Sequence, residues 1–279
     1  MHIANFLAKL YKKGLAYSTL CGYRSAISAY HVEVDGTKVG EHPRLIKLLK
    51  GVFNCRVPKK VVAPSWSLNK VLSSLKKAPY EPLNEVSLQW LSYKTAFLVC
   101  LCSASRCSDV SRLGYKDPYL RWVNRDMGVR LTPRALKKQC RPGHMFEEMF
   151  IPKYDKDRLL DPIRAIKMYL QRVKNRRLHD GLFITFGKGK RAGQDATAQT
   201  ISRWVRAVIQ LANPGATGVK AHSTRAVSTS LAFKQGVSLD AIMKAADWSL
   251  ASTFANHYLK ESMESQGMFA RTVLEGSRE

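Results

Sequence analysis

The feature that most constrains the fold is a strongly apolar segment from Leu88 to Ala104, in the first half of the chain. A helix that is apolar around its whole circumference is buried in a protein core or spans a membrane. The longest nearly apolar run in this segment, Thr95 to Ala104, has about half the length that a helix needs to cross a bilayer. The segment therefore predicts a buried helix in a folded protein, and we expect no membrane span.

The charge of the chain indicates a polyanionic partner. Lys and Arg number 46 against 21 Asp and Glu, which gives a net charge of +25. An excess of this size is typical of proteins that bind a partner of opposite charge, and the 45% content of apolar residues excludes a disordered basic tail. On charge alone, RNA, a ribosome and an anionic membrane fit as well as DNA.

The positive charge is spread over two parts of the chain. Residues 1–63 carry 11 basic and 3 acidic side chains, and residues 64–279 carry 35 and 18. Both parts are therefore positive, by +8 and +17, and we expect both to contact the same partner.

The cysteines and the glycine-rich segments argue against a cofactor. The first ten residues carry no secretory signal, so the six cysteines are predicted to be thiols in a reducing compartment. Cys100, Cys102 and Cys107 cluster without a CxxC pair, which favours buried structural cysteines over a zinc site. The stretch from Gly187 to Gly193 lacks the spacing of a phosphate-binding loop and indicates a basic surface loop. Phosphodiester chemistry by this chain is expected to need neither ATP nor a metal.

The first 63 residues predict a small all-helical domain. Apolar residues recur at helical spacing from Ile3 to Tyr11, from Leu20 to Tyr30 and again after Pro43, and Ser18 and Thr19 are placed to cap the second helix. A basic segment with prolines, residues 56–64, follows and is typical of an exposed linker. We therefore expect one domain at residues 1–63 and a second at residues 64–279.

The second part of the chain predicts helices around a short β region. Helical patterns follow Ser67, cover the apolar segment and recur at residues 201–209, 224–234, 239–246 and 251–258. An Asp-Met-Gly turn between Arg121 and Arg130 predicts one hairpin, and Arg141-Pro142-Gly143 predicts a second that leads into an edge strand at residues 144–151. The predicted fold class is mainly α with a small antiparallel β-sheet, in an α+β arrangement.

A constellation of chemically active side chains spans this second part. An HxxR motif comes first in the C-terminal third, a tryptophan follows its arginine by 23 residues, and a tyrosine follows that tryptophan by 10. HxxR alone carries little weight, but here an arginine at the end of the apolar segment and two lysines before the Pro-Gly turn accompany it. In chain order the members are Arg106, Lys137 or Lys138, His222, Arg225, Trp248 and Tyr258.

With these residues the chain resembles the tyrosine recombinase (phage integrase) superfamily, and the likeness covers nearly the whole sequence. The closest likeness is to the recombinases of DIRS-like retrotransposons and Crypton transposons. It is carried by Ala4–Leu7, Ser25–His31, Ser103–Asp109, His222–Arg225, Trp248-Ser249 and Ser252–Ala255. The resemblance implies a helical core-binding (SAM-like) domain at residues 1–63 and a mixed catalytic domain at residues 64–279.

The resemblance also assigns a role to each member of the constellation. Arg106 matches the first catalytic arginine, Lys138 the lysine of a β-hairpin, His222 and Arg225 the HxxR pair, Trp248 the His/Trp position, Tyr258 the nucleophile, and Asp109 the acidic residue that supports the first arginine. Lys137 remains an alternative to Lys138, because a shift of one residue in a hairpin reverses which side chain faces the site.

The chemistry of a phosphodiester explains these residue types. The phosphate gains negative charge in the transition state, so the guanidiniums of Arg106 and Arg225 would stabilise it through forked hydrogen bonds. The nucleophilic tyrosine must lose a proton, which the arginines favour and His222 would accept as a general base. Lys138 would protonate the departing 5′ oxygen, and Trp248 would donate an indole hydrogen bond.

The resemblance implies a site-specific DNA recombinase of a mobile element. Tyr258 would form a 3′-phosphotyrosyl link and release a 5′-hydroxyl, and because the link conserves the bond energy, no cofactor or metal is needed. The protein would clamp double-stranded DNA, form a homo-oligomer that is a dimer on one site and a tetramer in synapsis, and work in the nucleus. Two alternatives remain open: a domesticated DNA-binding protein without turnover, and a topoisomerase-like enzyme that nicks and closes DNA.

Further basic residues are candidate contacts to DNA phosphates, which set affinity and its salt dependence. They are Arg24, Lys59 and Lys60 in the N-terminal part and Arg134, Lys137, Arg141, Lys188, Lys190, Arg191 and Arg203 in the catalytic part. Apolar side chains follow Tyr258, among them Met263, Phe269 and Leu274. The family favours the docking of this last segment on a neighbouring protomer.

Overall fold

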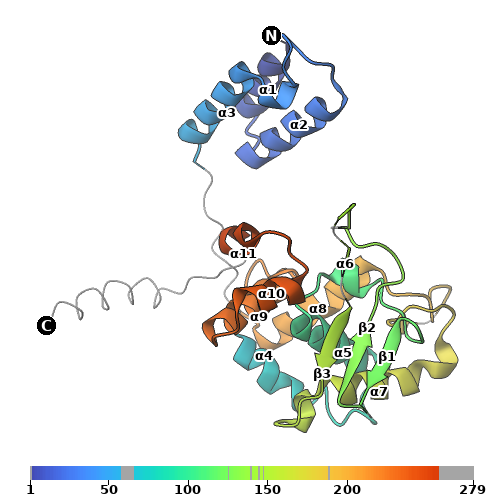
Figure 1. Cartoon of the computed structure of the whole chain (residues 1–279). Coiled ribbons are helices and arrows are strands. Elements are labelled where there is room, and N and C mark those ends of the chain that lie inside the picture. The colour runs from blue at the N-terminus through green and yellow to red at the C-terminus, as the bar shows by residue number, and fades with distance from the viewer. Residues whose placement is uncertain are drawn as a thin grey trace, which may run out of the picture. The chain divides into compact units, whose positions relative to one another are not determined.

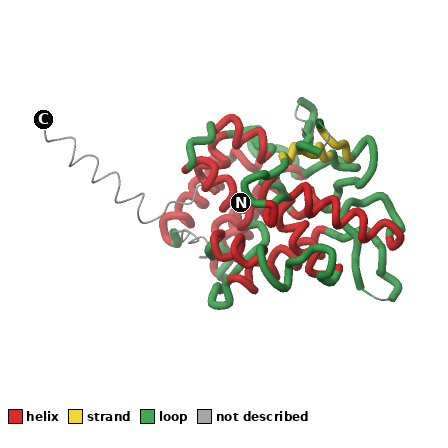
Figure 2. Tube along the Cα trace, turned by 90° about the horizontal axis from the view of Figure 1, so that it is seen from below, coloured by secondary structure: helices red, strands yellow, loops and turns green. Residues whose placement is uncertain are grey.

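A computed structural model describes residues 2–57, 66–124, 126–138, 140–143, 145–146, 148–187 and 189–257. The chain divides into two compact units: an N-terminal unit, Met1–Val62, and a C-terminal unit, Ala63–Glu279. Helices dominate, and strands occupy one small region of the C-terminal unit (Figure 1, Figure 2). This confirms the predicted fold class, mainly helical with a small antiparallel sheet.

The described part of the N-terminal unit is built from α1 (His2–Lys12), α2 (Tyr17–Tyr30) and α3 (Pro43–Cys55), with a short 3-10 turn, η1 (Val39–Glu41), before α3. The three predicted helices are therefore confirmed. The predicted cap of the second helix is wrong, because α2 already begins at Tyr17 and Ser18 and Thr19 lie inside its first turn. Two small apolar clusters hold the helices together: Leu7, Val39 and Leu45 in one, and Leu20, Leu49 and Val52 in the other.

The apolar segment forms α5 (Leu88–Cys102), the helix around which the C-terminal unit is built. It packs against α7 (Pro162–Val173), α8 (Ala198–Ala212) and α9 (Ser223–Lys234). Leu91, Phe97 and Val99 on different sides of α5 are fully buried, so the prediction of a buried helix is confirmed. The other helical elements of the unit are α4 (Leu68–Leu75), α6 (Cys107–Val110), α10 (Leu239–Ala246), α11 (Ala251–His257) and the 3-10 turns η2 (Arg158–Leu160) and η3 (Lys174–Arg176).

Helix α7 was not predicted from the sequence, although the sequence at its start carries two clear signals. Pro162 occupies the first helical position, where its missing N–H costs nothing. The carboxylate of Asp161 accepts hydrogen bonds from the backbone N–H groups of Ile163 and Arg164, at 3.0 and 3.2 Å. Both features are typical of helix starts.

The sheet has three antiparallel strands in the order β1 (Leu120–Val123), β2 (Gly128–Leu131), β3 (Met149–Pro152). The first predicted hairpin is confirmed, and Asp126 in its turn has a positive φ of 82°. The predicted edge strand is too long at its start. Leu131, the last residue of β2, pairs with Met149, the first residue of β3, so β3 begins at Met149 rather than at residue 144. The described residues between β2 and β3 (within residues 132–148) form no named strand and include a turn with a positive φ at Gly143.

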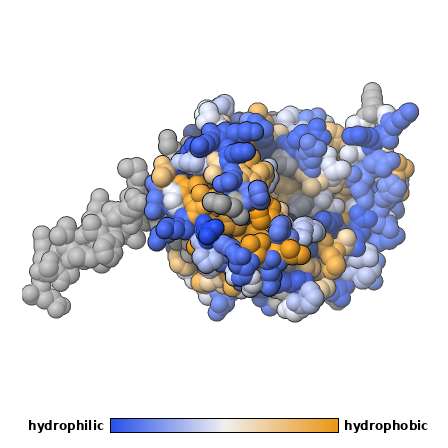
Figure 3. All heavy atoms as spheres, turned by 90° about the horizontal axis from the view of Figure 1, so that it is seen from above, coloured by the Kyte–Doolittle hydropathy of each residue, from blue (hydrophilic) through white to orange (hydrophobic). Residues whose placement is uncertain are grey.

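Hydrophilic residues cover much of the face shown in Figure 3, with apolar patches between them. Among the lysines and arginines in the described ranges, only Lys94, Lys137 and Arg225 are buried. Lys94 lies 2.5 Å from Glu81, which also binds Arg164 at 2.7 Å, so it belongs to an ion-pair network of the core. The other two buried cations are both members of the predicted constellation.

Within the described residues, no helix combines the length and the apolar character that crossing a membrane requires.

Candidate active site

The HxxR motif lies at the start of α9. His222 is the residue before the helix, and Arg225 lies in its first turn. Residues three apart on a helix share one face, so the imidazole and the guanidinium are placed on the same side of α9. His222 keeps part of its surface in contact with solvent, whereas Arg225 is only 1% exposed.

Arg225 is held from the side of α10. Its Nη2 donates a hydrogen bond to the carbonyl of Ala246, the last residue of α10. Its guanidinium lies 4.7 Å from the centroid of the Trp248 ring, close enough for a cation–π interaction. A buried guanidinium needs such partners because it cannot lose its charge. The arginine is therefore fixed in position while it keeps its positive charge.

A left-handed turn brings Trp248 back over the motif. Asp247 follows α10 with a φ of 53°, and the backbone N–H of Trp248 bonds to the carbonyl of Met243 at 2.9 Å. The indole is 4% exposed and lies 5.8 Å from the ring of Phe254 in α11. The turn thus joins α9, α10 and α11 in one small cluster (Figure 1).

Arg106 lies in the short connection between α5 and α6. It is the residue before α6, and Ala104, two residues earlier, has a φ of 47° and packs in the same apolar cluster as Trp248. The Nη1 of Arg106 lies 3.7 Å from Oδ2 of Asp109, whose side chain is only 4% exposed. The backbone N–H of Arg106 donates to the same oxygen at 3.4 Å. Asp109 therefore lies where the sequence placed a support for the first arginine.

The pKa of His222 is lowered by its surroundings. Partial burial lowers it below the ordinary value for histidine, and the positive charges of Arg225 and then Arg106 lower it further, while the charge of Asp109 acts in the opposite direction. The charges of both guanidiniums, and of the carboxylate that supports Arg106, therefore act on the imidazole. This environment favours the neutral ring.

The two candidate lysines differ in their surroundings. The Nζ of Lys137 lies 3.3 Å from Oδ2 of Asp247 and 5.4 Å from the centroid of the Phe146 ring, and its side chain is 4% exposed. Lys138 is exposed to solvent. Neighbouring residues of the 132–148 loop point in different directions, so only one of them meets the turn that carries Trp248. These contacts favour Lys137 over Lys138 as the lysine of the site.

Asp247 is not among the predicted site residues, although it contacts Lys137 and forms the turn before Trp248. An aspartate after a helix signals a turn, because its short polar side chain tolerates the left-handed conformation. Nothing in the sequence indicates its pairing with a lysine that is 110 positions away. A second contact between the same loop and turn joins Nη2 of Arg141 to Oγ of Ser249 at 3.3 Å.

Tyr258 lies outside the described residues, which end at His257 in α11. Phe254, four positions before it, lies against Trp248. The structure thus brings together Arg106, Asp109, Lys137, His222, Arg225 and Trp248, and the role of Tyr258 stays a prediction.

The candidate DNA contacts have varied surroundings. Four of them are exposed: Arg141, Lys190, Arg191 and Arg203. Arg24 is half-buried on α2, and Nη2 of Arg134 lies 2.6 Å from Oδ2 of Asp195, which neutralises part of its charge. Three more, Lys59, Lys60 and Lys188, lie outside the described residues. All remain predicted contacts.

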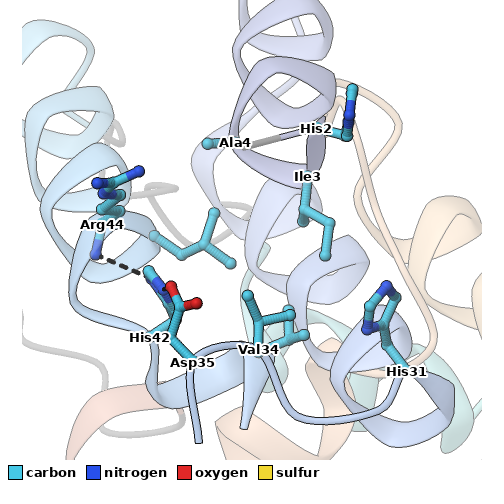
Figure 4. A pocket seen from close by; sticks show the side chains of 10 residues that line it. His2, Ile3, Ala4, His31, Val34, Asp35, His42 and Arg44 are labelled. Carbon is cyan, nitrogen blue, oxygen red and sulfur yellow. Dashed lines mark hydrogen bonds and ion pairs between the residues drawn. The ribbon is translucent and has the colours of Figure 1, made fainter. Parts of the chain in front are cut away.

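The N-terminal unit has a hollow of about 210 Å³ with apolar walls that include Ile3 and Val34 (Figure 4). His42 at its edge has partners at both ring nitrogens. Nδ1 accepts a hydrogen bond from the backbone N–H of Arg44 at 3.3 Å, and Nε2 lies 3.4 Å from Oδ2 of Asp35. The histidine therefore caps α3, and its place in the hollow is explained by the fold.

The chain is similar to known proteins both in sequence and in fold. The model of the phage integrase family matches residues 73–265. The fold is similar to the Tn1549 transposon integrase in complex with transposon right end DNA, with a TM-score of 0.63, 14% identity, and coverage of 98% of this chain and 83% of that one. It is also similar to XerH site-specific recombinase bound to a palindromic difH substrate, with a TM-score of 0.60, 16% identity, and coverage of 95% of this chain and 70% of that one. For XerA recombinase the TM-score is 0.50 and the identity is 14%, and the similarity covers 99% of this chain and 91% of that one. No curated protein matches the sequence.

Proposed function

The chain belongs to the phage integrase family of tyrosine recombinases, and from this premise we propose that it cleaves and rejoins DNA at specific sites through a covalent tyrosine intermediate. The phenolic oxygen of Tyr258 attacks a scissile phosphate and forms a bond to phosphorus. The bond from phosphorus to the 5′ oxygen breaks, and a 5′-hydroxyl leaves. Attack by the 5′-hydroxyl of a partner strand reverses the step, so the bond energy is conserved.

The observation that carries this proposal is that the protein fixes two guanidiniums, those of Arg106 and Arg225, beside the apolar cluster that contains Ala104 and Trp248. Arg106 is held by Asp109, and Arg225 by the carbonyl of Ala246 and the ring of Trp248. Two fixed positive charges with forked donors match a phosphate that gains negative charge in the transition state. A site that is already organised does not have to reorient its dipoles during the reaction.

Proton transfer is divided between His222 and Lys137. Partial burial and the charges of Arg225 and Arg106 lower the pKa of His222, which favours the neutral ring with one nitrogen able to take the proton of Tyr258. Lys137, between β2 and β3 in the chain, lies against Asp247 in the turn before Trp248, and its ammonium supplies the proton of the departing 5′ oxygen. The chain's own residues thus supply every proton and every stabilising charge in this scheme, which includes neither a metal nor a nucleotide.

Double-stranded DNA is the proposed partner. The net charge of +25 is shared by both parts of the chain, and most described lysines and arginines lie at the surface, where they can neutralise phosphates. Of the similar structures, the Tn1549 integrase was solved in complex with transposon right end DNA and XerH with a palindromic difH substrate. We propose that residues 1–63 bind DNA as the core-binding domain and residues 64–279 carry the catalysis.

The biological setting is inferred from the resemblance to DIRS-like and Crypton recombinases. In this setting the protein serves a mobile element, acts in the nucleus, and assembles as a dimer on each site and as a tetramer in synapsis. The apolar residues after Tyr258 supply the contact between protomers. Removal of residues 263–279 then abolishes assembly and leaves DNA binding by the monomer intact, as measured by sedimentation and by gel shift.

The proposed activity is tested on a nicked suicide duplex that carries the junction flanking the gene. Cleavage next to the nick releases a short 5′-hydroxyl strand and traps the covalent adduct. Recombinant products with a second duplex support the recombinase. Plasmid relaxation without such products supports the topoisomerase-like alternative, and DNA binding without any adduct supports the DNA-binding protein that lacks turnover.

A further inference from the structure

Trp66, the first described residue after the segment that joins the two units, makes a hydrogen bond inside the HxxR motif. Its indole N–H donates to Oγ of Ser223 at 2.8 Å, across 157 positions of sequence. The Ser223 hydroxyl in turn donates to the carbonyl of Lys220 at 2.5 Å. Ser223 directly follows His222, so the two bonds fix the turn that carries the histidine.

The neighbouring residue makes a second long-range bond. The backbone N–H of Ser67 donates to Oδ1 of Asn213 at 2.9 Å, and Nδ2 of Asn213 donates to the carbonyl of Ile209 at 3.1 Å, near the end of α8. Residues 213–222 between α8 and α9 have no regular secondary structure. Two consecutive residues, Trp66 and Ser67, thus fasten both ends of this irregular segment.

We propose that Trp66 is a positioning residue for His222: through the Ser223 hydroxyl it holds the start of α9 so that the imidazole stays beside Arg106 and Arg225. The inference rests on the proposed function. The irregular segment cannot set this position alone, because a loop lacks the repeating hydrogen bonds by which a helix fixes its residues.

Packing and hydrogen bonding by Trp66 are separable. The side chain is 8% exposed and belongs to the main apolar core of the C-terminal unit. The substitution Trp66→Phe keeps an aromatic ring in the core but removes the N–H donor and part of the ring volume, and the control Trp90→Phe makes the same change in ring size. An alanine at position 223 removes the acceptor and leaves the indole in place. The two substitutions therefore remove one hydrogen bond from opposite ends.

The pKa of His222 depends on where its imidazole lies. Its pKa is lowered by partial burial and by the charges of Arg225 and Arg106. A histidine that moves away from these groups loses both effects, and its pKa rises toward the ordinary value. A protein that is merely less stable, with the histidine still in place, keeps the lowered pKa.

The experiment compares wild type, Trp66→Phe, Ser223→Ala and a control, Trp90→Phe. Trp90 packs against the same core, and its ring lies 5.5 Å from each of the rings of Tyr80 and Tyr93. The pKa of His222 is measured by NMR titration of the full chain, with a His222→Gln variant to identify its resonance. Single-turnover cleavage of the suicide duplex and the Kd for the same duplex complete the comparison.

We expect Trp66→Phe and Ser223→Ala to raise the pKa of His222, to lower the cleavage rate between about tenfold and a hundredfold, and to leave the Kd unchanged. The double variant should lose no more than Ser223→Ala alone, because that variant already removes the bond to Trp66 together with the bond to Lys220. An unchanged His222 titration in both folded variants, or an equal shift in Trp90→Phe, would overturn the inference. A wild type without adduct would overturn the proposed function instead, and the titration would still decide the role of Trp66.

Discussion

The guanidinium of Arg225 lies 4.7 Å from the centre of the Trp248 ring, with both side chains almost fully buried. The arrangement joins α9, which carries Arg225, to the turn after α10, which leads into Trp248. A tryptophan face attracts a cation and excludes water from it, which strengthens the interaction of that cation with a phosphate. The predictions below follow from this pair and from the groups that surround it.

Replacement of Arg225 by lysine is expected to reduce single-turnover cleavage by about 10²- to 10³-fold, because an ammonium cannot bind the Ala246 carbonyl and fork two phosphate oxygens. DNA affinity should change little. The control is Arg206→Lys, which changes an exposed arginine on α8. Equal losses in the two variants would show that Arg225 has no special position.

Removal of the Trp248 side chain should destabilise the protein. Trp248→Ala leaves a cavity between Phe254 and the helices α9 and α10, so the free energy of unfolding should fall by about 3–5 kcal/mol in denaturant titrations. Trp122 is 38% exposed, and Trp122→Ala should cost less than about 1 kcal/mol. A loss at position 248 as small as that at position 122 would contradict the packing described.

The pH dependence of cleavage should reflect the lowered pKa of His222. Only the neutral ring accepts a proton, so the rate falls when the ring becomes protonated at low pH. Because burial and two arginines disfavour protonation, the midpoint of this fall should lie below the ordinary histidine pKa of about 6.5. His222→Gln should remove the fall. A midpoint at or above the ordinary value would contradict the proposed role.

Lys137 and Lys138 can be separated by the chemistry of the leaving group. Lys137→Ala should slow cleavage about 10²- to 10⁴-fold on a normal duplex. The Lys137→Ala variant should recover its cleavage rate on a duplex with sulfur at the 5′ bridging position. A thiol has a pKa near 8.5, so the sulfur can leave as a thiolate without receiving a proton. Lys138→Ala is the matched control and should cleave both duplexes at nearly the wild-type rate. The opposite pattern would assign the general acid to Lys138.

The sequence predicted the fold where local patterns decide it. The segment that forms α5 is apolar on all sides, so burial follows from its composition, and the period of 3.6 residues identified α1, α3 and α8. The start of α7 carries a proline and an aspartate cap at Asp161, but its amphipathic pattern stands beside a β region and did not by itself predict a helix. The predicted edge strand is longer than β3, because pairing with β2 ends at Met149 and depends on a partner strand that the local pattern does not contain.

The same distinction applies to the candidate site. The order and spacing of Arg106, His222, Arg225 and Trp248 could be recognised in the sequence. Which of two adjacent lysines enters the site could not, because a long loop between β2 and β3 sets their direction. The bonds of Asp247 to Lys137 and of Trp66 to Ser223 span 110 and 157 positions, and no local pattern encodes them.

The central claim is that Tyr258 cleaves DNA through a covalent bond, and the most direct measurement is the formation of an adduct on a nicked suicide duplex. The duplex carries the sequence that flanks the gene, and the product is separated under denaturing conditions. The account predicts a protein–DNA adduct linked through a 3′-phosphate for the wild type, and none for Tyr258→Phe, which should bind the duplex with the same Kd. An adduct that persists in Tyr258→Phe, or its absence from wild type that binds the duplex, would contradict the account.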